Sequence, residues 1–221
     1  KSKKKVIYNG VNVERIKGAS DDFWKSFCSE HGIDDDKIII TQIGRLEPVK
    51  NPMGSLRGFA RLKGMMDNTL WNRLRFVYMG NGSEMGKMKS FIKEHGLEEK
   101  VFLPGVIERD NVYSWMKRAN LLIIPSHFEG FCNTLVEGMV AGVNICTADL
   151  PVFKEIIPAT VRVDVFDSHN SDELSLALLR CLDKSSLSDL ELLKKRGTLS
   201  FSLESTVNNY LKLYNELLSK K

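Results

Sequence analysis

The sequence predicts an α/β fold built on a doubly wound parallel sheet. Short apolar runs, each closed by Gly or Pro, recur from about residue 37 onward, and helical patterns lie between them. The runs are apolar throughout rather than alternating, which is typical of strands buried on both faces, as in a parallel sheet. Because strand and helix alternate along the chain, we expect a Rossmann-like arrangement with helices on both faces of the sheet.

Six runs are the candidate strands. In chain order they are KIIITQIG (37–44), LRFVYMG (74–80), VFLPG (101–105), LLIIP (121–125), NICT (144–147) and VRVDV (161–165).

Four helical patterns stand out. Asn51 is a cap followed by a first-turn proline, which predicts a helix over 52–63. A stripe of apolar residues predicts a helix over 83–95, with Gly96 placed to end it. A third stripe consists of Leu174, Ala177, Leu178, Cys181 and Leu182. The last consists of Leu203, Val207, Tyr210, Leu211, Tyr214, Leu217 and Leu218.

The last stripe leaves two alternatives for the chain's organisation. We expect 1–221 to form one domain that is a piece of a longer protein, because the chain begins with Lys and KSKKK runs straight into apolar VIY. The helix over 203–221 either covers the sheet of this domain or docks on a neighbouring N-terminal domain.

Composition excludes few functions but sets the class. The 221 residues, 43% of them hydrophobic, suffice for a sizeable core. With 32 Lys and Arg against 28 Asp and Glu, the net charge of +4 does not favour nucleic acid as a partner. No apolar stretch approaches the roughly 18 residues of a membrane span, and no signal-peptide pattern opens the chain. We therefore expect a cytoplasmic protein.

The cysteines and the basic start carry little chemistry. The four cysteines show no C-x-x-C pair and no His at metal-ligand spacing, so we interpret them as packing thiols in a reducing compartment. They are Cys28, Cys132, Cys146 and Cys181. The run KSKKK is either a solvated linker or tail, or a contact to anionic lipid.

Three loops are predicted to share one edge of the sheet, because ligands of open α/β sheets bind beyond the carboxyl ends of the strands. They are GRLEPVKN (44–51), GNGSE (80–84) and SHFEGFCN (126–133). In the first loop, Arg45 and Lys50 would converge on an anion at a helix start. A hydrogen bond to a charged group contributes about 1.5–3 kcal/mol, against roughly 0.3–1 for a helix end, so the two cations should dominate phosphate affinity. Two solvated surface charges remain the alternative.

The second loop resembles the dinucleotide fingerprint G-x-G-x-x-G, but Gly86 comes one residue late. A tight turn that permits close approach of a ligand or backbone is the alternative. In the third loop, Gly130 allows a turn and Asn133 is a plausible cap for a helix over 134–141. Glu129 then lies in the loop and Glu137 in the first turns of the helix, with free amides between them aimed at negative charge.

These residues resemble a known family. GRLEPVKN, the turn GNGSE and PSHFEGFCNTLVEGMVAG match, in order, the motifs of the C-terminal, donor-binding domain of retaining nucleotide-sugar glycosyltransferases. This group has the two-domain GT-B fold and includes glycogen synthases and sucrose synthases. VIYNGVN resembles the stretch just after its interdomain linker, and the likeness covers residues 6–155.

The resemblance implies roles by position. Arg45 and Lys50 would hold the donor diphosphate and stabilise the leaving group, Glu129 would orient the transferred sugar, and Glu137 would accept hydrogen bonds from the ribose. Further donor contacts are implied for Gly44, Gly80, Gly82, Gly105, Val106, Ile107, Gly130, Phe131, Cys132, Asn133 and Thr134. Transfer to an acceptor hydroxyl, in glycan or polysaccharide biosynthesis, would retain the anomeric configuration.

The resemblance also limits what this chain does alone. The acceptor, a glycan or a lipid-linked sugar, would bind the N-terminal half, so the chain should bind donor but transfer little sugar. The family often has Gly at Cys132 and Pro at Asn144, so the identity of the sugar stays open, as do those of the base and the acceptor. Glu155 matches a later Glu of the family.

Rival functions remain beside this one. A metal-dependent transferase would use a D-x-D motif, but Asp34–Asp36 precede a strand and so lie at the wrong edge; we expect no metal and no cofactor. A glycosidase would also use two carboxylates, but it would not need Arg45 and Lys50. A non-catalytic nucleotide-binding regulatory domain is the remaining alternative.

Overall fold

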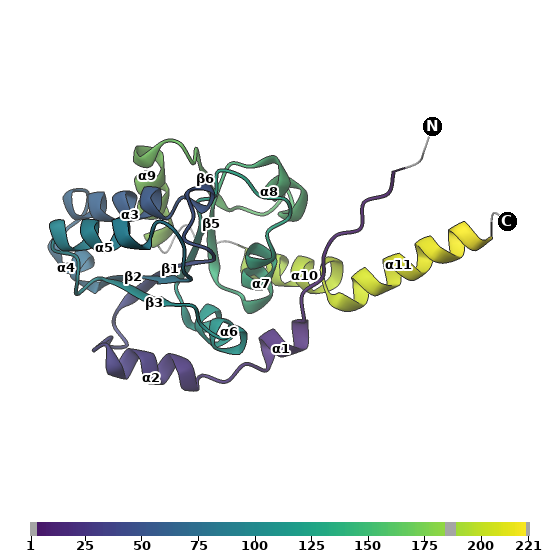
Figure 1. Ribbon diagram of the computed structural model, residues 1–221, viewed down its shortest axis with the longest axis horizontal. Coiled ribbons are helices and arrows are strands. Elements are labelled where there is room, and N and C mark those ends of the chain that lie inside the picture. The colour runs from purple at the N-terminus through teal and green to yellow at the C-terminus, as the bar shows by residue number, and fades with distance from the viewer. Residues whose placement is uncertain (1–3, 184–188, 220–221) are drawn as a thin grey trace.

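A parallel sheet of six strands lies at the centre of the computed structural model, which describes residues 4–183 and 189–219 (Figure 1). The strand order is β3-β2-β1-β4-β5-β6, and every neighbouring pair is parallel. The strands are β1 (Ile38–Ile43), β2 (Leu74–Met79), β3 (Val101–Gly105), β4 (Leu121–Ile124), β5 (Asn144–Ala148) and β6 (Asp164–Phe166). The predicted doubly wound α/β class is confirmed.

One predicted strand is displaced. Residues 161–165 were expected to pair, whereas β6 covers Asp164–Phe166. The amide of Val161 donates to the carbonyl of Pro158 in a turn at 2.9 Å. Pairing with β5 begins only where Asp164 lies opposite Cys146.

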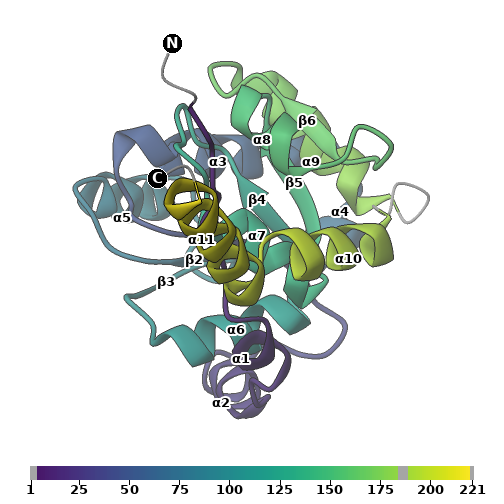
Figure 2. The same ribbon diagram turned by 90° about the vertical axis from the view of Figure 1, so that its right-hand side faces the viewer.

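Helices cover both faces of the sheet (Figures 1 and 2). Three pack together on one face, namely α3 (Pro52–Arg61), α5 (Met85–Glu94) and α9 (Ser171–Leu182). The other layer contains α6 (Arg109–Arg118), α7 (Asn133–Ala141) and α10 (Leu190–Ser200), with α1 (Val13–Lys17) and α2 (Asp22–Glu30) packed on α6. The remaining short elements are η1 (Pro48–Lys50), η2 (Leu62–Gly64), α4 (Asn68–Arg73) and α8 (Pro151–Ile156). The sequence patterns had not singled out α1, α2, α4, α6, α8 or α10.

The core fills the space between these layers. Strand β4 is buried along its whole length, and the largest fully buried side chains include Trp115, Tyr78, Phe59 and Phe76. All four cysteines are free and at least partly buried, as expected for packing thiols.

The predicted cap at Asn51 is confirmed. Asn51 has a left-handed backbone (φ 51°), and its Oδ1 accepts a hydrogen bond from the Gly54 amide at 3.1 Å. Gly54 suits this cap because a Cβ there would lie 2.2 Å from Asn51 Oδ1. The helix ends at Arg61, and 62–64 form a 3₁₀ turn instead of the predicted last α-helical residues.

The last helix, α11 (Leu203–Leu218), does not cover the sheet. It runs away from the body of the domain, beside the N-terminal segment (Figures 1 and 2). Val11 forms a bridge with Ser202, and the Thr206 hydroxyl donates to the Tyr8 carbonyl at 3.0 Å. No residue of α11 is buried, and the apolar stripe is about half exposed. Residues 220–221 of the predicted helix, and 1–3 of the basic run, lie outside the described residues.

Within residues 4–183 and 189–219, every helix falls short of the length and apolar character that a membrane span requires.

Candidate functional site

The topological switch point of the sheet lies between β1 and β4. From β1 the chain proceeds outward through β2 and β3, and from β4 it proceeds in the opposite direction through β5 and β6. Open α/β sheets bind ligands in the crevice at this point, beyond the carboxyl ends of the strands. The loops that follow β1 and β4 are those that carry Lys50 and Glu129.

Lys50 and Glu129 form an ion pair across the switch point. Lys50 Nζ lies 2.6 Å from Glu129 Oε1, and the Ser126 hydroxyl donates to the same oxygen at 2.8 Å. The Glu129 side chain is 8% exposed and that of Lys50 25% exposed, so both charges are partly withdrawn from water. Removing one partner of such a pair leaves an uncompensated charge, which is strongly unfavourable. The structure therefore brings together one cation of the first loop and the carboxylate of the third.

A buried polar network fixes the backbone of Lys50. The Gln42 amide donates to the Lys50 carbonyl at 2.8 Å, and the Ser55 hydroxyl donates to Gln42 Oε1 at 2.5 Å. The His127 amide donates to the Val49 carbonyl at 2.8 Å, and this hydrogen bond joins the first loop directly to the third. The two loops are thus joined twice, by the Lys50–Glu129 ion pair and by a hydrogen bond between their backbones.

The glycine-rich turn packs against the first loop. Its Asn81 carbonyl accepts from the Leu46 amide, and the Glu84 amide donates to the Leu46 carbonyl, both at 2.9 Å. A Cβ on Gly80 would lie 1.8 Å from the Gly44 carbonyl oxygen, and one on Gly82 would lie 2.4 Å from that of Leu46. The close approach expected of this turn is therefore an approach of backbone to backbone.

Glu47 also binds this turn. Its carboxylate accepts hydrogen bonds from the amide of Ser83 at 3.0 Å and from the hydroxyl at 2.6 Å. The amides of Ser83 and Glu84 thus donate to Glu47 and Leu46 of the first loop. The helix α5 begins after them, at Met85 rather than at the predicted residue 83. Hydrogen bonds from Ser83, together with the charge of Arg45, hold the pKa of Glu47 below its ordinary value.

The start of α7 differs from the prediction. Asn133 was expected to cap the helix, but it is exposed and is the first helical residue, and the cap position is Cys132. The Cys132 carbonyl accepts from the Leu135 amide at 3.1 Å, which starts the helix one residue early. Cys132 has a left-handed backbone (φ 76°), a conformation that favours glycine. Burial raises the pKa of its thiol to about 12, so the thiol stays protonated near Glu129.

Two cavities meet at Glu129. The larger measures about 650 Å³, and its lining includes Tyr8, Asn9, Glu129, Gly130, Phe131 and Glu155. The smaller measures about 40 Å³, and its lining includes Gly44, Lys50, Glu129, Cys132 and Thr134.

The N-terminal segment forms one wall of the larger cavity. The Tyr8 hydroxyl donates to Glu155 Oε2 at 2.8 Å, and this hydrogen bond raises the pKa of Tyr8. The Tyr8 ring also stacks on Phe131, with 5.7 Å between ring centroids. Residues before β1 and after β4 therefore face each other across one opening.

Glu137 lies in a separate polar cluster. Its Oε1 accepts from Arg109 Nη1 at 2.8 Å and from the Tyr113 hydroxyl at 3.1 Å, both on α6. Burial raises the pKa of the Glu137 carboxyl, whereas the charge of Arg109 and the hydrogen bond from Tyr113 lower it. Glu137 makes no contact with Lys50 or Glu129 within the described part of the chain.

Other predicted residues are less engaged. Arg45 is exposed, and within residues 4–183 and 189–219 its side chain makes no hydrogen bond or ion pair. Gly105 ends β3 and its carbonyl accepts from the Gly80 amide at 2.8 Å, Val106 is 78% exposed, and Ile107 packs partly against the core. Among the four predicted charged groups, the structure joins only Lys50 and Glu129, and neither Arg45 nor Glu137 lines the two cavities at Glu129.

Several residues of the site escaped the sequence patterns. Arg109 and Tyr113 belong to α6, which the sequence patterns did not predict, and only the fold places them beside Glu137. Gln42 did leave a signal, since it is a polar residue at a buried position of a strand that is otherwise mostly apolar. Ser126 also left one, because it directly follows the proline that closes β4.

Across the described ranges, His, Cys, Asp and Glu side chains form no group of three or more that would hold a metal ion. Asp34–Asp36 precede β1, at the edge opposite the switch point.

Comparison with known proteins adds a family. The model of the family "Glycosyl transferases group 1" matches residues 25–198. A Campylobacter jejuni protein is 32% identical over 146 residues, which are 65% of this chain and 34% of that protein. It is named N-acetylgalactosamine-N,N'-diacetylbacillosaminyl-diphospho-undecaprenol 4-alpha-N-acetylgalactosaminyltransferase. The D-inositol 3-phosphate glycosyltransferase of Mycolicibacterium smegmatis is 23% identical over 218 residues, 97% of this chain and 48% of that protein.

Solved structures share the fold. HepE from Anabaena, in complex with UDP and glucose, has a TM-score of 0.81 at 17% identity, covering 96% of this chain and 57% of that one. A glycosyltransferase from Rickettsia africae has a TM-score of 0.83 at 18% identity, covering 98% and 58%. The chain thus spans between a third and three fifths of these proteins, and it has the architecture expected for one half of a GT-B enzyme. With the family model matching most of its length, the chain belongs to the group 1 glycosyl transferases.

Proposed function

We propose that this chain is the donor-binding half of a retaining glycosyltransferase. It binds a nucleoside-diphosphate sugar and supports transfer of the sugar to an acceptor hydroxyl in glycan or polysaccharide biosynthesis. The observation that carries this proposal is the Lys50–Glu129 ion pair at the switch point, between two cavities. HepE, which shares the fold, has been solved with UDP and glucose, which supports the same ligand class here.

Each side of the pair has a task in transfer. The bond between the anomeric carbon and the diphosphate oxygen breaks, and its electron pair remains on the diphosphate. Lys50, joined by Arg45, stabilises this growing negative charge. Glu129 faces the larger cavity and orients the sugar through its hydroxyls. The acceptor oxygen bonds to the anomeric carbon and its proton passes to the departing diphosphate, with retention of configuration.

The acceptor belongs to a second domain. We infer that the acceptor site lies in the other half of a longer protein; that this chain covers 34% and 48% of the two curated relatives supports this inference. The exposed apolar stripe of α11 docks on that half, and the acceptor is a glycan or a lipid-linked sugar. A lipid-linked acceptor would bring the cytoplasmic full-length protein into peripheral contact with the membrane. The chain alone therefore transfers little or no sugar.

Calorimetric titration with UDP, GDP, ADP and their common sugar adducts tests the proposal. Lys50→Ala should weaken diphosphate binding by roughly 10- to 150-fold, the loss of one charge-assisted hydrogen bond. Lys37→Ala is the matched control. Lys37 directly precedes β1, whereas Lys50 lies in the loop that follows it. Lys37 pairs with Asp36 at 2.7 Å and is 16% exposed, against 25% for Lys50. Its removal should leave the affinity unchanged.

Three outcomes would count against the proposal. Failure of all three nucleotides to bind would remove it, and equal losses in Lys50→Ala and Lys37→Ala would remove the role of Lys50. If nucleotide binding strictly required Mg²⁺, the proposed chemistry, which uses no metal ion, would be wrong. A regulatory role is separated by Glu129→Ala in the full-length protein, where we expect a large loss of transfer with modest loss of binding.

A further inference from the structure

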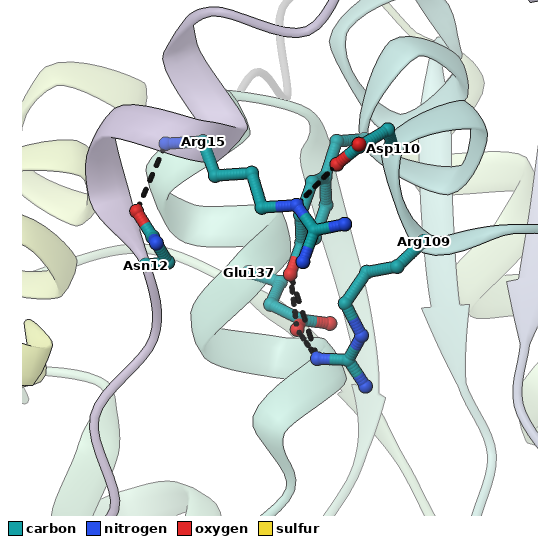
Figure 3. A network of polar contacts seen from close by, with 6 residues as sticks. Asn12, Arg15, Arg109, Asp110 and Glu137 are labelled. Atoms are coloured by element: carbon teal, nitrogen blue, oxygen red, sulfur yellow. Dashed lines mark hydrogen bonds and ion pairs between the residues drawn. The ribbon is translucent and has the colours of Figure 1, made fainter.

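Glu137 is a mostly buried carboxylate that the protein holds by one oxygen. Its side chain is 7% exposed, and Arg109 Nη1 reaches Oε1 (Figure 3). The Tyr113 hydroxyl donates to the same oxygen. In the described part of the chain, Oε2 accepts no hydrogen bond from the protein. An ionised carboxylate has about four acceptor sites. Within the described residues Oε2 is not among the side-chain atoms that are buried without a partner, so it keeps access to solvent. Glu137 is therefore suited to accept donor groups from a ligand at Oε2.

Arg109 governs how this carboxylate is presented. It is the first residue of α6, which follows β3 after a loop that contains Val106 and Ile107. Its side chain is 58% exposed, so it covers Glu137 from the solvent side. Its positive charge opposes the effect of burial on Glu137 and favours the ionised form.

The first turn of α6 is itself braced. Asp110 pairs with Arg15 of α1, and the Asn12 side chain caps α1 by accepting from the Arg15 amide at 3.0 Å (Figure 3). Arg109 therefore stands on a helix turn whose position is set by a second ion pair. A side chain anchored in this way can fix the orientation of its partner.

We propose that Arg109 is a positioning residue for the nucleoside of the donor. By engaging Oε1 of Glu137, it leaves Oε2 to accept the ribose hydroxyls of the bound nucleotide. This inference rests on the proposed function, and it assigns to Arg109 a share in ribose recognition that acts through Glu137. A role limited to joining α6 to α7 would instead alter stability alone.

The test compares two ligands on each variant, so that the folded fraction cancels. The best-binding of UDP, GDP and ADP is titrated beside its 2′,3′-dideoxy analogue, and the ratio of the two Kd values reports ribose recognition. In the wild-type chain the analogue should bind roughly 10- to 150-fold more weakly. In Arg109→Ala and in Glu137→Gln this ratio should fall about tenfold, and Arg109→Lys should restore part of it.

Arg118→Ala is the matched control. Arg118 is the last residue of the same helix, pairs with Asp21 and is 51% exposed, so its removal changes the same charge on the same element. We expect its ratio to equal that of the wild type. A wild-type ratio in Arg109→Ala, or tighter binding of the ribonucleotide by that variant, would overturn the inference alone. Failure of the wild-type chain to bind any of the three nucleotides would overturn the proposed function with it.

Discussion

Replacing Gly80 by Ala should disrupt the joint between the glycine-rich turn and the first site loop. Gly80 has a φ of 150°, and a Cβ there would lie 1.8 Å from the Gly44 carbonyl oxygen. Such contacts are essentially never closer than 3.0 Å, so one backbone must move by about 1 Å. That movement would break the interlocked hydrogen bonds between the two loops.

Alanine substitutions at two other glycines separate the two causes of lost stability, backbone strain and steric overlap. Gly44 has a φ of 143° but open space around its Cβ position, so Gly44→Ala suffers backbone strain alone, about 1–3 kcal/mol. Gly86 lies in α5 with neither strain nor contact, and Gly86→Ala should stabilise by up to about 1 kcal/mol. Gly80→Ala combines the strain with overpacking of about 1–3 kcal/mol more, a total of roughly 2–6 kcal/mol.

Urea unfolding followed by tryptophan fluorescence gives the ranking. We expect the unfolding free energy to decrease from Gly86→Ala through Gly44→Ala to Gly80→Ala. In thermal unfolding the Tm should differ by roughly 2–4 °C per kcal/mol for a chain of this size. A Gly80→Ala variant as stable as Gly86→Ala would show that the 1.8 Å contact is relieved without breaking the joint. That result would refute the reasoning.

Two further predictions concern a cap and a buried charge. Asn51→Ala loses the cap of α3 and must also adopt a φ of 51°, so its unfolding free energy should fall by about 2 kcal/mol, whereas Asn51→Gly fits the backbone and should lose less than about 1; equal losses in urea unfolding would contradict this. Burial raises the pKa of Glu137 and Arg109 lowers it, so Arg109→Ala raises it further. A carboxyl whose pKa is higher in the folded chain than its unfolded value of about 4.3 favours folding when protonated. The stability lost in Arg109→Ala should therefore grow as the pH rises above about 4.3, and unfolding free energies that differ equally from wild type at acid and neutral pH would disprove the coupling.

Much of the site was predictable because it follows from strand ends. Apolar runs closed by Gly or Pro predict where parallel strands stop, and Lys50 and Glu129 each follow such a stop within one loop. Since all carboxyl ends of a parallel sheet lie at one edge, residues 79 positions apart could be expected on the same side of the molecule. The cap at Asn51 was predictable for a similar reason, because it depends on the next three residues alone.

Local preference failed where packing set the backbone. Asn133 has the better side chain for a cap, yet Cys132 takes the position in a left-handed conformation. The strand expected at 161–165 shifted because Val161 is engaged in a turn. Neither outcome follows from residue type, since both depend on how the neighbouring loop reaches its helix or strand.

The sequence by itself determined the α/β class, the strand segments and the loops that carry the charged groups, because each depends on residues close together in the chain. The tertiary structure alone decided that β1 lies beside β4 and that Lys50 therefore meets Glu129 at a switch point. It also decided that Glu137 is held by Arg109, from a helix 28 positions earlier, and that α11 leaves its apolar stripe uncovered. Strand order and helix packing arise from contacts between distant segments, and those contacts leave no periodic or local pattern in the chain.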